Sequence, residues 1–323
     1  MLSKPFFSVI IPVYNKEPHI ARAIKSVLNQ TFQDFEIIVV CDPSTDNSNF
    51  EVKKFKDSRI RVYFRDKPGP GGYAARNLGI KNSKSNWIAF IDADDEWSAN
   101  HLASLYALQA SDKSLKILSS GWCINIDNFS YECSALKAYP QRKTFNYQEY
   151  LTDDCKGLSP MWTSSICIDR DTLIECGMFP DGKITMGGDV DTWVRCVANV
   201  DCLGWTGIST ATYFRDSVNM VTKNSIIEPD LHIETSAILL TYNNNKLIKR
   251  LIKRRANKYI RIAWNNNLRN RMRPFDIGKY LYFDVEPAIF CVYATLNAIP
   301  YPVQYYLRFS YDFLKRIIGK IFR

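Results

Sequence analysis

The sequence contains little of several residue patterns that mark common classes of protein. Its 323 residues include only three histidines, His19, His101 and His232, whose wide separation does not match the spacing of a zinc site. The nine cysteines include no Cys-x-x-Cys pair, and their odd number and irregular spacing predict free thiols in a reducing compartment. No apolar stretch reaches the roughly 20 residues that a membrane-spanning helix needs. These absences argue against a zinc protein, a disulfide-stabilised secreted domain and an integral membrane protein.

Other absences concern targeting and nucleotide-binding motifs. Residues 1–5 lead directly into the first apolar run without a signal-peptide pattern, which predicts a cytoplasmic catalytic body. The glycines of Gly69–Gly72 match neither the Gly-x-Gly-x-x-Gly pattern nor the P-loop pattern. The sequence therefore disfavours dinucleotide binding and nucleoside triphosphate hydrolysis.

Charge is distributed unevenly along the chain. The net charge is +9, but residues 240–323 alone hold 17 Lys and Arg against 4 Asp and Glu, which gives this part +13 and the rest −4. With 46% apolar residues, the chain is long enough for one large domain and an appendage. We expect any attraction to polyanions to lie in the basic appendage.

Strand and helix patterns alternate through the first hundred residues. Apolar runs rich in β-branched residues predict strands, and apolar residues at helical spacing over 17–30 predict a helix between the first two. The predicted strands are 6–13, 35–41, 59–64 and 86–92. This alternation indicates an α/β fold with a Rossmann-like, mostly parallel central sheet covered by helices on both faces.

The later part of the chain is mixed and then helical. We predict strands within 115–124, 164–168 and 203–209, and helices within 170–176, 189–199 and 246–273. The last of these has eleven basic residues and no acidic ones. We therefore predict one domain over 1–216, with parts 6–100 and 101–216, and a helical basic extension over 217–323.

Three aspartates follow the predicted strand 86–92 within four residues: Asp92, Asp94 and Asp95. Ligands of parallel α/β sheets bind beyond the carboxyl ends of the strands, and several carboxylates placed together there repel one another. Oxygen ligands of this kind suit Mg²⁺ or Mn²⁺, which in turn hold diphosphates. The alternative is a solvated acidic loop that caps the next helix.

Polar residues also follow the other predicted strands. Pro12, Tyr14 and Asn15 end the first strand and Asp42 ends the second, while a Gly-rich turn leads to Arg76 and Asn77. An aromatic ring, a carboxylate and a cation could together hold a nucleoside diphosphate. Each motif alone also fits ordinary turns, helix caps or a solvated helix face.

These motifs, in their order, resemble one family. The stretches 7–15, 30–32, 36–46, 75–79 and 90–95, and a later block over 177–179 and 188–195, are similar to the inverting nucleotide-sugar glycosyltransferases of family 2, which have the glycosyltransferase-A fold. The resemblance covers roughly residues 6–215. It implies that 6–100 bind the nucleotide-sugar and that 101–216 shape the acceptor side of a catalytic domain.

The resemblance also assigns roles to single residues. It implies that Asp42 contacts the nucleobase, that Asp92 contacts the ribose, that Asp94 and Asp95 bind Mn²⁺ or Mg²⁺, and that Asp189 is the catalytic base. The full set of expected substrate-binding residues is Pro12, Tyr14, Asn15, Asp42, Arg76, Asn77, Asp92, Asp191 and Trp193. Cys41, Pro43 and Gly188 stand where the family usually has Asp, Gly and Glu.

The residue types suit sugar transfer. A metal ion can neutralise a departing diphosphate, and a carboxylate can accept the proton of an attacking hydroxyl, which inverts the anomeric carbon. If a helix begins at 189, the side chains of Asp189 and Asp191 point about 200° apart, so only one of them serves that hydroxyl. The alternative is that Asp189 only stabilises the N-terminus of this helix, where a negative charge complements the helix dipole.

The C-terminal segment 303–323 has an apolar stripe beside basic residues. This pattern predicts an amphipathic helix on an anionic membrane surface; the alternatives are packing on the catalytic domain and, with no nucleic-acid motif present, nucleic-acid binding. Combined with the resemblance, it leads us to expect a peripheral protein on the inner face of the cytoplasmic membrane. We expect a nucleotide-sugar donor, UDP-linked, and a lipid-linked glycan acceptor in bacterial O-antigen or capsule synthesis.

Two other functions compete with a glycosyltransferase. A sugar nucleotidyltransferase shares the sheet topology but needs a Gly-rich phosphate loop after the first strand, where this chain has Tyr14 and Asn15. A catalytically silent scaffold at the membrane would have no need of both the aspartate cluster and Asp189.

Overall fold

The computed structural model describes residues 4–127, 129–217 and 229–307. The chain divides into two compact units, residues 1–223 and 224–323. The sequence predicted a boundary between residues 216 and 217.

The first unit contains a ten-stranded sheet and its covering helices. Its strands are β1 (Phe7–Val13), β2 (Phe35–Cys41), β3 (Ile60–Phe64), β4 (Trp87–Phe90), β5 (Glu96–Trp97), β6 (Ile117–Ile126), β7 (Phe129–Glu132), β8 (Lys143–Asn146), β9 (Ile166–Asp169) and β10 (Cys202–Phe214). Its α-helices are α1 (Ile20–Leu28), α2 (Ser48–Lys53), α3 (Tyr73–Asn82), α4 (His101–Ser111), α5 (Ser134–Ala138), α6 (Tyr147–Lys156), α7 (Arg170–Glu175) and α8 (Gly188–Ala198), with short 3-10 helices η1 (Pro70–Gly72) and η2 (Thr163–Ser165).

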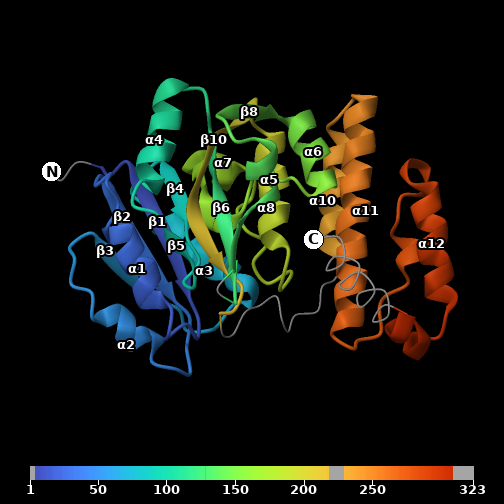
Figure 1. Cartoon of the computed structure of the whole chain (residues 1–323), viewed down its shortest axis with the longest axis horizontal. Coiled ribbons are helices and arrows are strands. Elements are labelled where there is room, and N and C mark those ends of the chain that lie inside the picture. Colours follow the sequence, from blue (N-terminus) through green and yellow to red (C-terminus); the bar gives the residue numbers. More distant parts are fainter. Residues whose placement is uncertain (1–3, 128, 218–228, 308–323) are drawn as a thin grey trace. The chain divides into compact units, whose positions relative to one another are not determined.

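The first four strands form the parallel part of the sheet. Their order is β3-β2-β1-β4, and β1 pairs in parallel with both β2 and β4. Figure 1 shows β3, β2 and β1 side by side in this order. Their carboxyl ends therefore lie at one edge of the sheet, as the sequence predicted.

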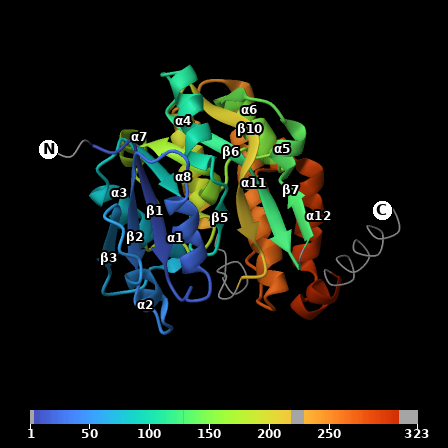
Figure 2. The same ribbon diagram turned by 60° about the vertical axis from the view of Figure 1, so that its left-hand side comes forward.

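The second half of the sheet is mixed. Strand β9 lies antiparallel between β4 and β6, and β10 runs parallel to β6. Strands β5, β7 and β8 add antiparallel pairs at the margins, and Figure 2 shows β7 beside β6. Because β9 runs opposite to β4, its start and not its end lies at the edge where β4 ends. The parallel character predicted from the sequence thus holds for the first four strands.

Alternating side chains of β1 bury both faces of the sheet. Val9 and Ile11 pack in the core with Ile20 and Ile24 of α1. On the other face, a Cβ atom on Gly79 of α3 would lie 2.6 Å from the Ile10 side chain. Strands with both faces covered are continuously apolar, which is why this pattern was readable in the sequence.

The second unit is helical within the described residues. Its elements are α10 (Asp230–Thr241), α11 (Lys246–Arg269), α12 (Pro287–Ala298), η3 (Ile277–Lys279) and η4 (Phe283–Val285).

Helix α11 is the long basic helix that the sequence predicted over 246–273. The Asn245 side chain caps it by accepting hydrogen bonds from the Leu247 and Ile248 amides. It ends at Arg269, shortly before Arg271 adopts a φ of 56°. Across the described ranges, no helix combines the length and apolarity needed to cross a membrane. The predicted C-terminal amphipathic helix falls largely on residues 308–323, which lie outside the described part.

Candidate active site

The aspartate cluster lies directly after β4, and two of its carboxylates have cationic partners. Arg76 Nη2 donates to Asp92 Oδ1 at 2.5 Å. Lys16 Nζ donates to Asp94 Oδ2 at 2.7 Å. Two of the three negative charges are thereby compensated by cations from α3 and from the segment after β1.

Arg76 is a buried cation, 6% exposed. Besides Asp92 it binds the Gly71 carbonyl through Nη1 at 2.9 Å. Gly71 and Gly72 have φ angles of 65° and 69°, a conformation that favours glycine. The glycine turn that the sequence singled out therefore shapes the approach to α3 and fixes the guanidinium.

Asp95 is the third member of the cluster and has no cationic partner within the part of the chain that the structure describes. Ser164 Oγ donates to its Oδ2 at 2.5 Å, while its buried Oδ1 accepts no hydrogen bond among the described residues. Burial, together with the charges of Asp92 and Asp94, raises the pKa of Asp95 well above its usual range. The fold therefore holds a carboxyl group whose ionised form is unfavourable without a further cation.

Asp94 and Asp95, the predicted metal ligands, are only two carboxylates. The described residues contain no group of three or more His, Cys, Asp or Glu side chains arranged to hold a metal. Mg²⁺ commonly takes only one or two protein carboxylates and completes its shell with substrate phosphates and water. Asp94 and the unpartnered Oδ1 of Asp95 suit this kind of site, in which the ion binds together with a diphosphate.

The ends of β1 and β2 form the neighbouring part of the edge. Tyr14 is 47% exposed, and Asn15 has a φ of 51° while its Oδ1 accepts the Thr45 amide at 2.8 Å. Asp42 is buried, and its two oxygens accept Arg65 Nη1 at 2.6 Å and the Gly69 amide at 3.1 Å. These contacts hold Asp42 in one orientation at the end of β2, next to the end of β1 that Tyr14 follows.

Pro12, also predicted to contact substrate, lies against the glycine turn. A Cβ atom on Gly72 would stand 3.6 Å from the Pro12 Cβ. This close approach joins the end of β1 to the turn before α3.

Asp189 lies in the first turn of α8. Its Oδ2 accepts a hydrogen bond from Thr163 Oγ1 at 3.2 Å. Burial raises the pKa of Asp189, and the negative charge of Asp92 raises it further. The Val190 amide and the positive charge of Arg76 lower this pKa, but the net shift is upward. Asp189 therefore shares an electrostatic environment with the cluster after β4, although almost a hundred residues separate them in the sequence.

Gly188, where the resembling family usually has Glu, is packed tightly. The Tyr73 hydroxyl accepts the Gly188 amide hydrogen at 2.8 Å. A Cβ atom at 188 would lie 2.7 Å from both Tyr73 Cζ and Pro180 Cγ. The Tyr73 ring thus occupies the space that a side chain at 188 would need. Tyr73 was not among the predicted site residues.

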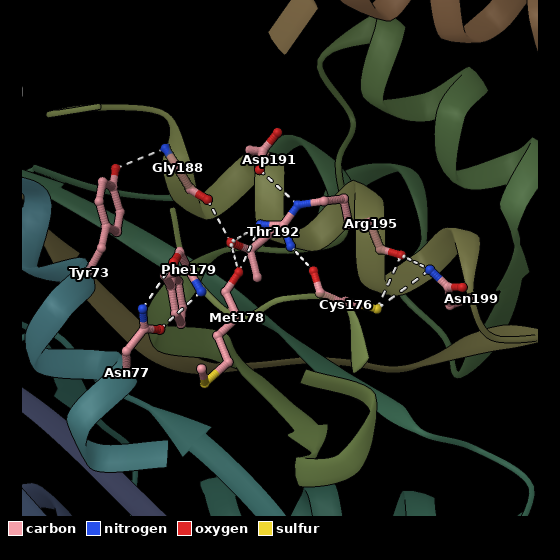
Figure 3. A network of polar contacts seen from close by, with 10 residues as sticks. All are labelled: Tyr73, Asn77, Cys176, Met178, Phe179, Gly188, Asp191, Thr192, Arg195 and Asn199. Atoms are coloured by element: carbon pink, nitrogen blue, oxygen red, sulfur yellow. Dashed lines mark hydrogen bonds and ion pairs between the residues drawn. The ribbon is translucent and has the colours of Figure 1, made fainter. Parts of the chain in front are cut away.

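Arg195 holds the loop before α8 in place (Figure 3). It donates to the Cys176 carbonyl, to the Met178 carbonyl at 2.8 Å and to Asp191 Oδ2 at 2.9 Å. Met178 itself has a φ of 54°. One arginine therefore fixes the α8 start and the 176–178 loop relative to each other.

Three predicted substrate contacts have inward-facing side chains in this structure. Asn77 exchanges two hydrogen bonds with the Phe179 backbone, at 2.9 and 3.0 Å. Asp191 is 1% exposed and paired with Arg195, and Trp193 is 1% exposed with its ring against Phe179. The contacts that these three make position α8 and its loop. Asp189 and Asp191 have different partners, Thr163 and Arg195.

The turn 162–164 connects the two parts of the site and was missed by sequence reasoning. Ser164 Oγ accepts the Asp92 amide at 3.0 Å and donates to Asp95, and the adjacent Thr163 donates to Asp189. The turn precedes β9, whose reversed direction brings it to this edge. Three consecutive hydroxyl residues, Thr163, Ser164 and Ser165, between apolar neighbours were the only sign of it in the sequence.

Comparison with known proteins finds a family similar to the first half of the chain. The model described as "Glycosyl transferase family 2" matches residues 8–165, just under half of the sequence. The matched stretch includes the carboxylate cluster and the turn 162–164, and it ends before Asp189.

Curated relatives match smaller parts. WfgD of Escherichia coli, named a UDP-Glc:alpha-D-GlcNAc-diphosphoundecaprenol beta-1,3-glucosyltransferase, is 43% identical over 95 residues, which are 29% of this chain and 37% of that protein. An uncharacterized glycosyltransferase of Methanocaldococcus jannaschii is 27% identical over 206 residues, covering 61% of this chain and 67% of that protein. The chain thus spans little more than a third of the length of WfgD.

A solved structure matches nearly the whole chain. Staphylococcus aureus TarS, residues 1–349, in complex with UDP-GlcNAc, has a TM-score of 0.70 and 16% identity, and the match covers 95% of this chain and 91% of that chain. This likeness confirms the glycosyltransferase-A fold that the sequence predicted.

Removal of the Asp95 charge is expected to stabilise the metal-free protein. Because the pKa of Asp95 is raised in the fold above its ordinary value of 3.8, the ionised carboxylate opposes folding at pH 7. Asp95→Asn removes the charge and keeps an acceptor for Ser164, so the Tm in chelator rises. The Tm difference between Asp95→Asn and the wild type should narrow as the pH falls through the pKa of Asp95 in the folded protein, because the wild-type carboxyl group then becomes neutral.

The exposed Asp181 provides a matched control. Asp181→Asn should leave the Tm close to that of the wild type. An Asp95→Asn protein that melts at or below the wild-type Tm at pH 7 would contradict the electrostatic account of the cluster.

Proposed function

We propose that this protein is a metal-dependent inverting glycosyltransferase. It moves a sugar from a UDP-linked donor to a hydroxyl of a lipid-linked glycan during assembly of a bacterial surface polysaccharide. The observation that carries the proposal is the meeting, through one turn, of a carboxylate cluster suited to a metal-bound diphosphate and a separate carboxylate, Asp189, suited to a base.

The donor half follows from the ends of β1, β2 and β4. The exposed Tyr14 ring packs against the nucleobase, and Asp42, oriented by Arg65 and Gly69, accepts its imino proton in a hydrogen bond. UDP is favoured because TarS was solved with UDP-GlcNAc and the name of WfgD specifies UDP-glucose. Asp92, oriented by Arg76, contacts the ribose in this proposal.

A divalent ion held by Asp94 and Asp95 would supply positive charge to the diphosphate when bound. Lys16, which pairs with Asp94 here, can remain beside the same phosphates as a further cation. Arg76 is buried and holds Asp92 and Gly71, so its contribution to the phosphates is through its charge. The pKa of Asp95 is raised in the protein without such an ion. A bound cation would favour the ionised carboxylate.

The transfer step uses Asp189 as the base. Its carboxylate accepts the proton of the acceptor hydroxyl while the hydroxyl oxygen forms a bond to the anomeric carbon. The bond from that carbon to the diphosphate oxygen breaks on the opposite face, and the diphosphate leaves with the electron pair. Thr163 holds the Asp189 carboxylate in position, and the buried pair of Asp191 and Arg195 fixes the helix that carries it.

The acceptor and membrane assignments rest on other observations. The WfgD name specifies a diphosphoundecaprenol-linked acceptor, which lies at a membrane. The basic excess of this chain lies in residues 240–323, and Lys246, Arg250 and Arg254 form an exposed stripe along α11. A lipid-linked acceptor and a basic extension are consistent with action at an anionic membrane surface.

Nucleotide binding is expected to require metal and Asp94. In calorimetric titrations with UDP, GDP and dTDP, we expect UDP to bind in the presence of Mn²⁺ and to bind much more weakly without it. Asp94→Ala should abolish the Mn²⁺-dependent part, whereas Asp181→Ala, at an exposed position, should not. A folded wild-type protein that binds none of the three nucleotides would overturn the donor site.

Asp189→Asn is expected to separate chemistry from donor binding. UDP should bind as it does to the wild type, while transfer falls by roughly 10²–10⁴-fold because the base is lost. In the wild type the rate should rise with pH through the pKa of Asp189, which burial raises above 3.8, so the acidic limb lies above the range of an ordinary aspartate. Transfer by Asp189→Asn at more than a tenth of the wild-type rate would exclude Asp189 as the base.

Membrane association is expected to depend on the basic residues of the C-terminal segment. Changing Arg308, Lys315, Arg316 and Lys320 to Gln should strongly reduce sedimentation with anionic vesicles, since each basic residue contributes about 1 kcal/mol near such a surface. The wild-type binding should also weaken with salt and be low on neutral vesicles. As a matched control, Lys56, Lys67, Lys84 and Lys137, exposed in the first unit, are changed to Gln. Equal loss from both quadruple variants would contradict a role for the C-terminal segment.

A further inference from the structure

Three aromatic side chains form a continuous wall in the first unit. The Trp122 and Trp162 ring centroids lie 5.4 Å apart, and those of Trp162 and Tyr213 lie 5.1 Å apart. The ring planes are inclined by 35° and 47°. The rings come from β6, from the turn before β9 and from β10, so the sheet topology alone brings them together. We call these three residues the aromatic wall.

The aromatic wall is partly open. All three residues are partly exposed, and the two tryptophans pack on one side against the core. Within the described residues neither the Trp122 nor the Trp162 indole N–H has a hydrogen-bond partner. Neither of these N–H groups is fully buried. By contrast, the indoles of Trp97 and Trp205 donate to backbone carbonyls at 2.6 and 2.8 Å. The wall therefore offers ring surface and two free donors, which a purely structural cluster does not require.

The aromatic wall adjoins both halves of the proposed active site. Trp162 directly precedes Thr163, which donates to Asp189, and Ser164, which donates to Asp95. Tyr213, which forms one end of the wall, lies near the cluster, since burial and the nearby charge of Asp95 raise its pKa to about 12. Trp162 is therefore next in the chain to the residue that contacts the proposed base, and Tyr213 lies near the carboxylate cluster.

We propose that the aromatic wall is the subsite for the pyranose ring of the acceptor. This inference rests on the proposed function and names the surface that holds the sugar whose hydroxyl reacts. The C–H-bearing face of a neutral sugar carries weak positive charge that is attracted to the negative face of an aromatic ring. Ligand sites of this kind combine aromatic walls with a few polar groups that fix orientation, and the free indole N–H groups can donate to sugar hydroxyls.

The position of Trp162 favours the acceptor sugar over the donor sugar. The attacking hydroxyl must lie within hydrogen-bond reach of the Asp189 carboxylate, which the residue next to Trp162 contacts at 3.2 Å. The donor diphosphate belongs beside Asp94 and Asp95, at the Tyr213 end. None of the three wall residues carries charge at neutral pH, so the subsite suits a neutral ring.

The test uses indole signals of the full chain in ¹H–¹⁵N spectra. The chain has seven tryptophans, and Trp122→Phe and Trp162→Phe assign the two signals of interest. With saturating UDP and Mg²⁺, methyl glycosides of neutral hexoses and N-acetylhexosamines are added up to about 100 mM, well above the millimolar Kd expected of one stacked ring. We expect at least one glycoside to move both signals saturably, while the signals of the buried Trp193 and Trp264 stay in place.

Variants then test the contribution of the ring. Trp162→Ala should weaken the glycoside Kd roughly two- to tenfold, with Trp162→Phe closer to the wild type. Phe129→Ala removes an aromatic ring that is 75% exposed on β7 and should have no effect. Tyr213→Leu repeats the test at the other end of the wall if Trp162→Ala does not fold.

The outcomes separate this inference from the proposed function. If UDP binds but no glycoside moves the two signals, or the wall variants bind glycoside as well as the wild type, the subsite is overturned and the transferase proposal stands. If no nucleotide binds while glycosides still move the wall signals, the donor assignment fails and the sugar-binding surface remains.

Discussion

Repulsion among closely spaced carboxylates is the constraint on which the rest of this site depends. Asp92, Asp94 and Asp95 follow one strand within four residues, and each has a different partner: a buried guanidinium, an ammonium group and a serine hydroxyl. The partners come from α3, from the segment after β1 and from the turn before β9. Three separate parts of the fold must therefore meet at this edge before the carboxylates are tolerable.

The reversal of strand direction at β9 completes the arrangement. Since β9 runs antiparallel to β4, the turn 162–164 arrives at the carboxyl edge, where a further parallel strand would have delivered a different loop. One turn then contacts the cluster through Ser164 and Asp189 through Thr163. The same turn therefore holds both the carboxylate cluster and the proposed base, Asp189, in fixed positions.

Local pattern predicted much of this architecture. The first four strands, their parallel pairing and the basic helix α11 follow from apolar runs and helical spacing, and the strand-end motifs pointed to the edge at which the carboxylates meet. The turn 162–164, the aromatic wall and Tyr73 were not predictable in this way. Their contacts join residues 69 positions apart for Asp95 and Ser164 and 115 for Tyr73 and Gly188, and such pairings depend on strand order. Three residues in motif positions instead make contacts within the protein: Asn77, Asp191 and Trp193.

The close packing of Tyr73 against Gly188 couples two distant positions in the chain. A glutamate at 188, usual in the resembling family, cannot enter while the tyrosine ring is present, because its Cβ would lie 2.7 Å from that ring. Loss of the tyrosine alone would leave a void beside the start of α8 and an amide without its acceptor. Replacing Gly188 alone or Tyr73 alone would therefore disturb the start of α8. The residues at the two positions are expected to change together. In an alignment of related chains, a bulky residue at one should accompany a small residue at the other.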